Sequence, residues 1–198
     1  MRRLAVCVLL LCLLPGCASV APSALVRPAT SARAYQESVD LNGRLSIRYQ
    51  ANGKDEALHG NFVWAQNPAR TKVTLLSPLG QTVADINITA NGATLQQAGN
   101  MQRSAPNVDE LVASTLGWPL PIAGLRNWLQ GFGVSSNGDT FVASPQAPEI
   151  TTRDGWHIHY TSWQDDNSAQ SRPKRIDLER QTAQAGDVAI RIVIDTWQ

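Results

Sequence analysis

The sequence LNGRLSIRYQANGKDEALHGNFVW, residues 41–64, carries the clearest structural signal in the chain. In its first half, Leu45, Ile47 and Tyr49 alternate with arginine and serine, and a period of two is typical of a strand with one buried face. A turn at residues 52–54 follows, and Phe62 and Trp64 then continue the alternation. The two segments predict a β-hairpin, the unit from which an antiparallel sheet is built.

Further strands are expected on the C-terminal side of this hairpin. Apolar alternation recurs at residues 73–75, 84–88 and 93–97, and the intervening turns contain Pro78, Gly80 and Gly92. It returns near the C-terminus at residues 156–160, 176–178 and 188–194. These segments predict a strongly curved antiparallel sheet.

The period changes between the two groups of strands. Apolar residues recur at intervals of three and four over residues 106–117, and Asn107 with Glu110 forms a capping pair, so a helix is expected there. A second helix is expected from Pro121 to a stop at Gly131. The predicted fold class is therefore mainly β (α+β), with the helical pair on one face of the sheet.

The N-terminus has the features of a secretory signal. Arg2 and Arg3 precede eleven apolar residues, which is too short for a membrane span, and Leu14-Pro15-Gly16-Cys17 follows. That end resembles the lipobox of bacterial lipoproteins, which implies removal of residues 1–16 and lipidation of Cys17. Residues 17–37 are rich in Ala, Ser and Pro and predict a flexible tether, which leaves residues 38–198 as the domain.

Composition excludes several classes of protein. All three cysteines of the 198 residues lie within the first 17, so no disulfide framework can form in the body of the chain. The 17 Lys and Arg residues against 16 Asp and Glu give a net charge of +1, which argues against an electrostatic nucleic-acid binder. Stable anchoring by two or more acyl chains at Cys17 is the membrane association that remains.

The sequence offers little catalytic chemistry. His157 and His159 share one face of a strand, but with His59 as the only other histidine no zinc ligand set is completed, so no metal is expected. Asp165 and Asp166 lie in a polar segment that is typical of a solvated turn. Nucleophile elbows, zincin motifs and phosphate loops are missing from the sequence, so we expect neither an enzyme nor a cofactor.

The informative residues are apolar, and two interpretations of them stay open. Six Trp against three Phe, several on inward positions, are compatible with an ordinary core. A curved sheet that does not close, covered by two short helices, can instead leave a cavity for acyl chains. Leu79 stands between Pro78 and Gly80 at the tip of a turn, where it could dip into a bilayer and couple cargo release to lipid.

With these features together, the chain resembles the LolB family of outer-membrane lipoprotein receptors. Besides the lipobox, the match rests on Gly43-Arg44-Leu45, Phe62-Val63-Trp64, Leu76-Ser77-Pro78-Leu79-Gly80, Leu116-Gly117-Trp118-Pro119-Leu120-Pro121, Gly124-Leu125-Arg126-Asn127-Trp128-Leu129 and Ile194-Asp195-Thr196-Trp197. The resemblance implies an open half-barrel of about eleven strands with a helical lid over an apolar cavity. Members accept acylated lipoproteins from the periplasmic carrier LolA and insert them into the outer membrane without consuming nucleotide.

The resemblance also assigns roles to residues. It implies that Leu79 is the protruding apolar residue used in transfer. The inward residues expected to line the acyl-chain cavity are Leu45, Ile47, Phe62, Trp64, Val73, Leu75, Ile86, Leu111, Leu116, Leu125, Trp128, Leu129, Ile158 and Tyr160. Because Ala18 and Ser19 follow Cys17 in place of an aspartate retention signal, the resemblance implies a position in the inner leaflet of the outer membrane, with the domain in the periplasm. A monomer is expected.

A second function class stays open beside this one. A lipid-anchored envelope-assembly or structural module would bind protein or glycan, and its inward apolar residues would form a packed core. Arg44, Arg48, Arg126 and Arg175 could provide a docking face for an acidic partner, although solvated strand and helix faces account for them equally well.

Overall fold

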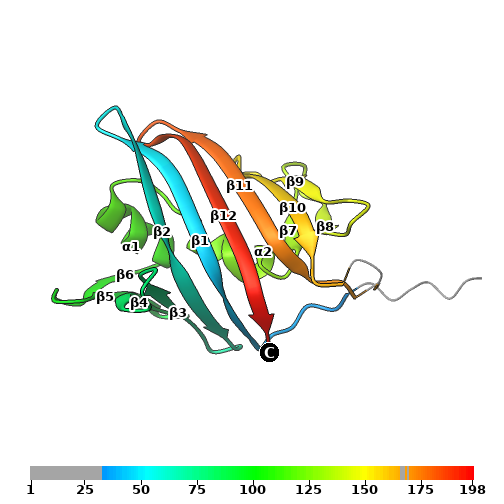
Figure 1. Cartoon of the computed structure of the whole chain (residues 1–198), viewed down its shortest axis with the longest axis horizontal. Helices are drawn as coiled ribbons and strands as arrows, with labels where there is room; N and C mark the ends of the chain where they lie inside the picture. The colour runs from blue at the N-terminus through cyan, green and yellow to red at the C-terminus, as the bar shows by residue number, and fades with distance from the viewer. Residues whose placement is uncertain (1–32, 166–167, 169) are drawn as a thin grey trace, which may run out of the picture. The chain divides into compact units, whose positions relative to one another are not determined.

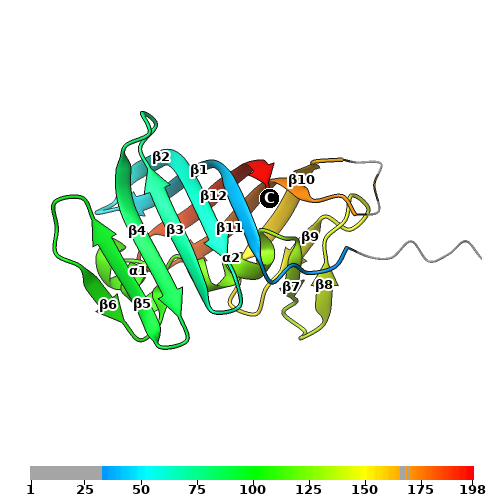
Figure 2. The ribbon, with the colours of Figure 1, turned by 90° about the horizontal axis from the view of Figure 1, so that it is seen from below.

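A ten-stranded antiparallel sheet dominates the computed structural model, which describes residues 33–165, 168 and 170–198. Within those residues the sheet order is β6-β5-β4-β3-β2-β1-β12-β11-β10-β9, and a separate hairpin contains β7 and β8. The sheet curves strongly and its edge strands do not meet (Figures 1 and 2). The mainly β (α+β) fold expected from the sequence is confirmed, with ten strands in the sheet and two in the hairpin where the resemblance implied about eleven in all.

The strand bounds follow the predicted alternation closely and extend it at both ends. The strands are β1 (Val39–Ala51), β2 (Lys54–Gln66), β3 (Arg70–Leu76), β4 (Thr82–Thr89), β5 (Gly92–Gln97), β6 (Arg103–Ala105), β7 (Phe132–Val134), β8 (Thr140–Val142), β9 (Glu149–Thr151), β10 (His157–Trp163), β11 (Pro173–Thr182) and β12 (Gly186–Trp197). The three-residue strands β6 to β9 were not predicted, because three residues are too few to display a period of two.

The long hairpin of β1 and β2 forms the middle of the sheet. Leu41 lies opposite Trp64 and Leu45 opposite Gly60, so the apolar sets of both strands share one face. The pairing of β1 with β12 shifts at Gly43, where a side chain would collide with the carbonyl oxygen of Val193. A glycine at this bulge therefore allows the two central strands to approach each other.

Both helices lie on one side of the sheet (Figure 1). In α1 (Val108–Leu116), the side chain of Asn107 accepts a hydrogen bond from the backbone N–H of Glu110, and Gly117 ends the helix in the left-handed conformation at φ 84°. Helix α2 (Ile122–Trp128) follows after a short connection. Neither helix in the described part of the chain has the length and apolar content needed to cross a membrane.

The inner face of the sheet is filled unevenly. At the β9–β11 side, Tyr160 stacks between Phe141 and Trp163, and its hydroxyl donates to the backbone oxygen of Trp128 at 3.0 Å. Ile158, Ile176 and other side chains of these strands are completely buried. This half of the sheet is therefore packed by the β7–β8 hairpin and the end of α2.

A short arm, Arg33–Glu37, joins the domain ahead of β1. The Arg33 guanidinium donates to the backbone oxygens of Gln130 at 3.0 Å and Ala143 at 3.2 Å, and also to that of Ser171. Gln36 and Gln130 exchange two hydrogen bonds of 2.9 Å. The described domain therefore begins about five residues before the boundary expected from the sequence, and Cys17 with most of the predicted tether lies outside the described residues.

Candidate functional site

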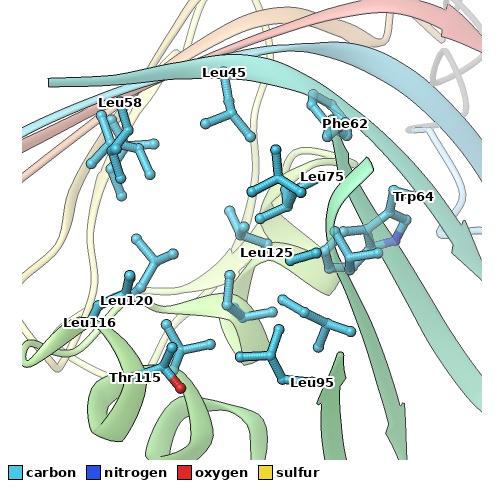
Figure 3. A pocket seen from close by; sticks show the side chains of 18 of the residues that line it. Leu45, Leu58, Phe62, Trp64, Leu75, Leu95, Thr115, Leu116, Leu120 and Leu125 are labelled. Atoms are coloured by element: carbon cyan, nitrogen blue, oxygen red, sulfur yellow. The ribbon is translucent and has the colours of Figure 1, made fainter. Parts of the chain in front are cut away.

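An apolar cavity of about 320 Å³ lies between the sheet and the two helices. Figure 3 shows side chains from the sheet and from the helices pointing toward one another across this space, with Leu45 and Phe62 on one side and Leu116 and Leu120 on the other. The volume lies within the range of small-molecule pockets, and almost all of the side chains that line it are apolar.

The wall of the cavity comes from the strands on one side of the packed β9–β11 part of the sheet, beginning with β12, which pairs with β11. Strands β1 to β5 and β12 contribute Leu45, Ile47, Leu58, Phe62, Trp64, Val73, Leu75, Val83, Ala84, Ile86, Leu95, Gln97, Ile190 and Ile192. The helices and their flanks contribute Val112, Thr115, Leu116, Leu120, Ile122, Leu125 and Leu129. The alternation that the sequence shows thus delivers one face of the strands to the cavity, and Val83 is added where the pairing of β3 with β4 shifts in register.

The cavity has a mouth formed by exposed apolar side chains. Leu58 is 42% exposed, Val83 is 48% exposed and Leu116 is 38% exposed, although all three line the interior. In Figure 3, Leu58, Leu116 and Leu120 lie on the same side of the cavity. An apolar group could therefore enter here while remaining in contact with apolar side chains.

The cavity lacks the chemistry needed for polar recognition. Gln97 and Thr115 are the polar residues among those that line it, and no lining residue is ionisable. The Thr115 hydroxyl donates to the backbone oxygen of Leu111 at 2.8 Å, so its proton is already used within α1. The site can hold hydrocarbon, and it offers no group for acid–base or covalent catalysis.

The structure brings most of the residues that were predicted for the cavity into its wall. Those on the wall are Leu45, Ile47, Phe62, Trp64, Val73, Leu75, Ile86, Leu116, Leu125 and Leu129. Leu111, Trp128, Ile158 and Tyr160 are buried but lie outside the wall. The alternation of apolar residues correctly places Ile158 and Tyr160 on the inner face of the sheet, but their strand, β10, lies in the part that is filled with side chains. Burial there raises the pKa of the Tyr160 hydroxyl.

Sequence reasoning missed several residues of the wall. These are Leu58, Val83, Ala84, Leu95, Gln97, Val112, Thr115, Leu120, Ile122, Ile190 and Ile192. Ile190 and Ile192 had a usable signal, because they alternate in β12 and β12 pairs directly with β1. Gln97 and Thr115 had no such signal, since polar residues are not expected on an apolar wall.

Leu79 lies at the tip of the β3–β4 connection, where it is 89% exposed. The backbone N–H of Gly80 donates to the oxygen of Ser77 at 2.9 Å, and Gly80 has φ 82°, so the chain reverses directly after Leu79. The N–H of Ser77 donates to the oxygen of Gln81 at 2.8 Å and closes the base of the turn. The local geometry therefore holds a leucine in solvent.

The polar candidates from the sequence are engaged in ordinary surface contacts. His159 Nε2 lies 3.6 Å from Glu149 Oε1, and the ring of His157 lies 3.3 Å from the hydroxyl of Thr151. Within the part of the chain that the structure describes, no group of three or more His, Cys, Asp or Glu residues is arranged to hold a metal ion.

The arginines considered as a docking face are mostly paired. Arg44 makes a two-pronged contact with Asp195 at 2.9 and 3.1 Å, and Arg175 lies 2.7 Å from Asp177. Arg126 donates to the hydroxyl of Thr71. These contacts favour a role on a solvated sheet face, as neighbouring opposite charges commonly have.

Comparison with known proteins shows the family. The family model for outer membrane lipoprotein LolB matches residues 37–197. An outer-membrane lipoprotein LolB from Cupriavidus necator is 39% identical, over 98% of this chain and 96% of its own length. Relatives with the same name from Thiobacillus denitrificans and Shewanella baltica are 35% and 31% identical, over 100% and 95% of this chain and 98% and 85% of their own lengths.

Solved structures with similar architecture have little sequence in common with this chain. A DUF1329 family protein from Desulfovibrio piger has a TM-score of 0.50 at 9% identity, over 83% of this chain and 87% of its own, which supports the fold. A LolA superfamily protein from Nitrosomonas europaea has a TM-score of 0.48 at 10% identity, over 84% of this chain and 87% of its own. The sequence relatives are named as lipoproteins, in agreement with the expectation that the chain is not an enzyme. From the extent of the family match and the identity of these relatives, the chain belongs to the outer membrane lipoprotein LolB family.

Proposed function

We propose that this domain receives the acyl chains of a lipoprotein from the periplasmic carrier LolA and passes the lipoprotein to the outer membrane. The observation that carries the proposal is the apolar cavity, whose lining residues include no ionisable side chain. A cavity with these walls takes up hydrocarbon without any partner for a charged or sugar-like ligand. Family membership supports the same role.

Free-energy differences between apolar environments would set the direction of transfer. Moving each CH₂ group from water into hydrocarbon is favourable by about 0.8 kcal/mol, so acyl chains would pass between protein and bilayer without release into water. Most of this contribution cancels between one apolar environment and the next. What remains is the quality of packing in the carrier, the receptor and the bilayer, and a small preference at each step suffices.

The proposal extends to the N-terminal residues, which lie outside the described part of the chain. Lipidated Cys17 would anchor the protein in the inner leaflet of the outer membrane, and residues 17–37 would tether a monomeric domain in the periplasm. The sequence after Cys17 contains no aspartate at the next position, which supports outer-membrane sorting by resemblance.

The test is a transfer experiment between purified components. The mature chain with Cys17→Ala is mixed with LolA that carries an acylated lipoprotein, and a pull-down shows which protein holds the cargo. We expect the cargo to move to this chain. If the cargo stays on the carrier while circular dichroism shows a folded domain, the function is instead that of a lipid-anchored assembly module with a packed core.

A matched pair of variants ties the result to the cavity. Leu116→Glu places a carboxylate at the mouth, where the wild-type side chain is 38% exposed and the fold tolerates it. Val63→Glu is the control, because Val63 is 37% exposed on β2 and does not line the cavity. We expect Leu116→Glu to lose cargo and Val63→Glu to keep it, and equal loss in both variants would argue against the cavity.

Delivery is tested separately at the β3–β4 turn. Leu79→Glu changes a side chain without buried contacts, so folding and cargo uptake should be unaffected. We expect lipoprotein to accumulate on the receptor, because a charged tip is unfavourable in a bilayer. Normal delivery to vesicles by this variant would refute the role assigned to Leu79.

A further inference from the structure

The β1–β2, β3–β4 and β5–β6 connections share one end of the sheet, and the α1–α2 connection lies near it, where Trp118 packs on Tyr49 close to the end of β1. Because antiparallel neighbours alternate in direction, the β3–β4 and β5–β6 connections fall at the same end, as Figure 2 shows. The backbone N–H of Ala98 donates to the oxygen of Val83 at 3.3 Å, which joins the bases of the two connections. Leu116 at the end of α1 and Leu120 of the α1–α2 connection line the cavity on the same side as Leu58 of β2 (Figure 3).

The β5–β6 connection presents a second exposed apolar tip. Met101 is 90% exposed, as much as Leu79 in the β3–β4 connection. The turn before it is ordered by Gln96, whose side-chain amide donates to the backbone oxygen of Asn100 at 2.6 Å, and by Gly99 at φ 75°. The turn therefore holds the methionine in solvent, and with Leu79 it gives this end of the domain two exposed apolar tips.

Charged residues at this end of the domain are Lys54, Asp55 and Glu56 at the start of β2 and Arg103 at the start of β6, but three segments carry none. Residues 77–82, 97–102 and 113–121 contain no Asp, Glu, Lys or Arg, although such residues make up 17% of the chain. We call these three segments the uncharged rim. The exposed cavity residue Leu116 belongs to the third segment, and the exposed cavity residue Val83 directly follows the first. The rim thus has two apolar tips and no charge, and it adjoins the cavity mouth.

We propose that the uncharged rim is a bilayer-docking surface, and that Met101 enters the lipid interface beside Leu79. This inference rests on the proposed function and adds to it a second contact residue and the face that meets the membrane. A bilayer fits because the two most exposed large apolar side chains among the described residues, Leu79 and Met101, lie at the same end as the exposed cavity residues Val83 and Leu116. Docking here would also place the cavity mouth against lipid, so acyl chains could leave without crossing water.

Fluorescence at single positions tests the docking directly. Cys7 and Cys12 lie in the predicted signal and Cys17 is the predicted lipidation site, so Met101→Cys supplies a single free thiol in the mature lipidated chain. The thiol is labelled with the environment-sensitive dye NBD, and the protein is anchored in vesicles that contain lipids with a quencher at the acyl-chain level. Val134→Cys is the matched control, because Val134 is an exposed apolar residue on β7, outside the rim.

We expect a blue-shifted, quenchable signal at position 101 and a solvent-like signal at position 134. A solvent-like signal at position 101 would overturn the inference and would leave the proposed function untouched, because cargo uptake from LolA is measured without vesicles. Quenching at both positions would also overturn it, since the rim would then not be the docking face.

A substitution then distinguishes a membrane contact from a contact with the carrier. Met101→Glu alters an exposed turn residue, and Met101→Leu restores an apolar tip. With Glu we expect about a tenfold slower insertion of cargo into vesicles, the cost of losing one apolar side chain from lipid, and unchanged uptake from LolA. If uptake slows and insertion does not, the rim binds the carrier and the membrane assignment is wrong.

Discussion

Replacing Ala84 with leucine tests whether the space beneath the sheet is a true cavity. Ala84 is buried in β4 between Leu75 of β3 and Gln97 of β5, and all three residues line the cavity. A larger side chain at this position would point into the empty volume. In a packed core the same substitution would force neighbouring side chains apart.

The expected size of the effect follows from the cavity volume. Cavity volume in a protein interior is unfavourable by about 24 cal/mol per Å³, and the 320 Å³ here is more than one added leucine side chain can fill. A leucine fills a part of that volume, and the neighbouring strands would still shift slightly to accommodate it. We therefore expect Ala84→Leu to raise the free energy of unfolding by about 1–2 kcal/mol, whereas overpacking a closed core lowers it by about 1–3 kcal/mol.

Urea unfolding of the mature chain, followed by Trp fluorescence, measures this difference. The matched control is Ala93→Leu, since Ala93 is equally buried in neighbouring β5 but does not line the cavity. We expect stabilisation for Ala84→Leu, destabilisation for Ala93→Leu, and weaker binding of a fluorescent fatty acid to the first variant alone. A loss of stability of about 1–3 kcal/mol in both variants would refute the existence of usable empty space.

Three further predictions concern the scaffold. Gly43→Ala should lower the free energy of unfolding by about 2–4 kcal/mol in urea titrations, because its methyl group would collide with the carbonyl oxygen of Val193; a neutral effect would mean that the β1–β12 bulge relaxes freely. Arg33→Met should cost about 3 kcal/mol by the same assay, since the buried backbone oxygens that accept from its guanidinium lose a charged donor, and wild-type stability would show that the arm is not part of the folded unit. Burial tends to raise the pKa of Asp177, but hydrogen bonds from two arginines outweigh this effect and lower the pKa. The contribution of Asp177 to the free energy of unfolding should therefore be complete above about pH 4 and be lost as the pH falls further. Asp177→Asn should weaken this loss of stability in acid, and an unchanged loss would assign it to other carboxylates.

The sequence was informative where one physical rule acts alone. Alternation of apolar residues places Leu45, Phe62 and Trp64 on one face of β1 and β2, and they do lie on one face because the pleat of a strand leaves no other option. The caps at Asn107 and Gly117 locate α1 for a similarly local reason. Such features need no knowledge of distant parts of the chain.

The cavity boundary depends on long-range packing and could not be predicted in the same way. Ile158 on β10 and Ile192 on β12 have the same parity signal, yet only Ile192 lines the cavity. The difference arises because the β7–β8 hairpin and Trp128 fill the space beneath β10. The three-residue strands of that hairpin are too short to show an alternation of apolar residues. The sequence therefore did not reveal the hairpin that fills one part of the inner face and leaves the cavity in the other.

The uneven filling of one sheet explains how a domain of this size can remain folded around empty space. The side chains on the β9–β11 side, including Trp156, Ile176 and Leu178, are almost completely buried, and this packed part of the sheet stabilises the domain while the other part stays hollow. Acyl chains entering the other half would recover the lost contacts, so cargo binding and stability are coupled, and a loaded domain should resist urea better than an empty one.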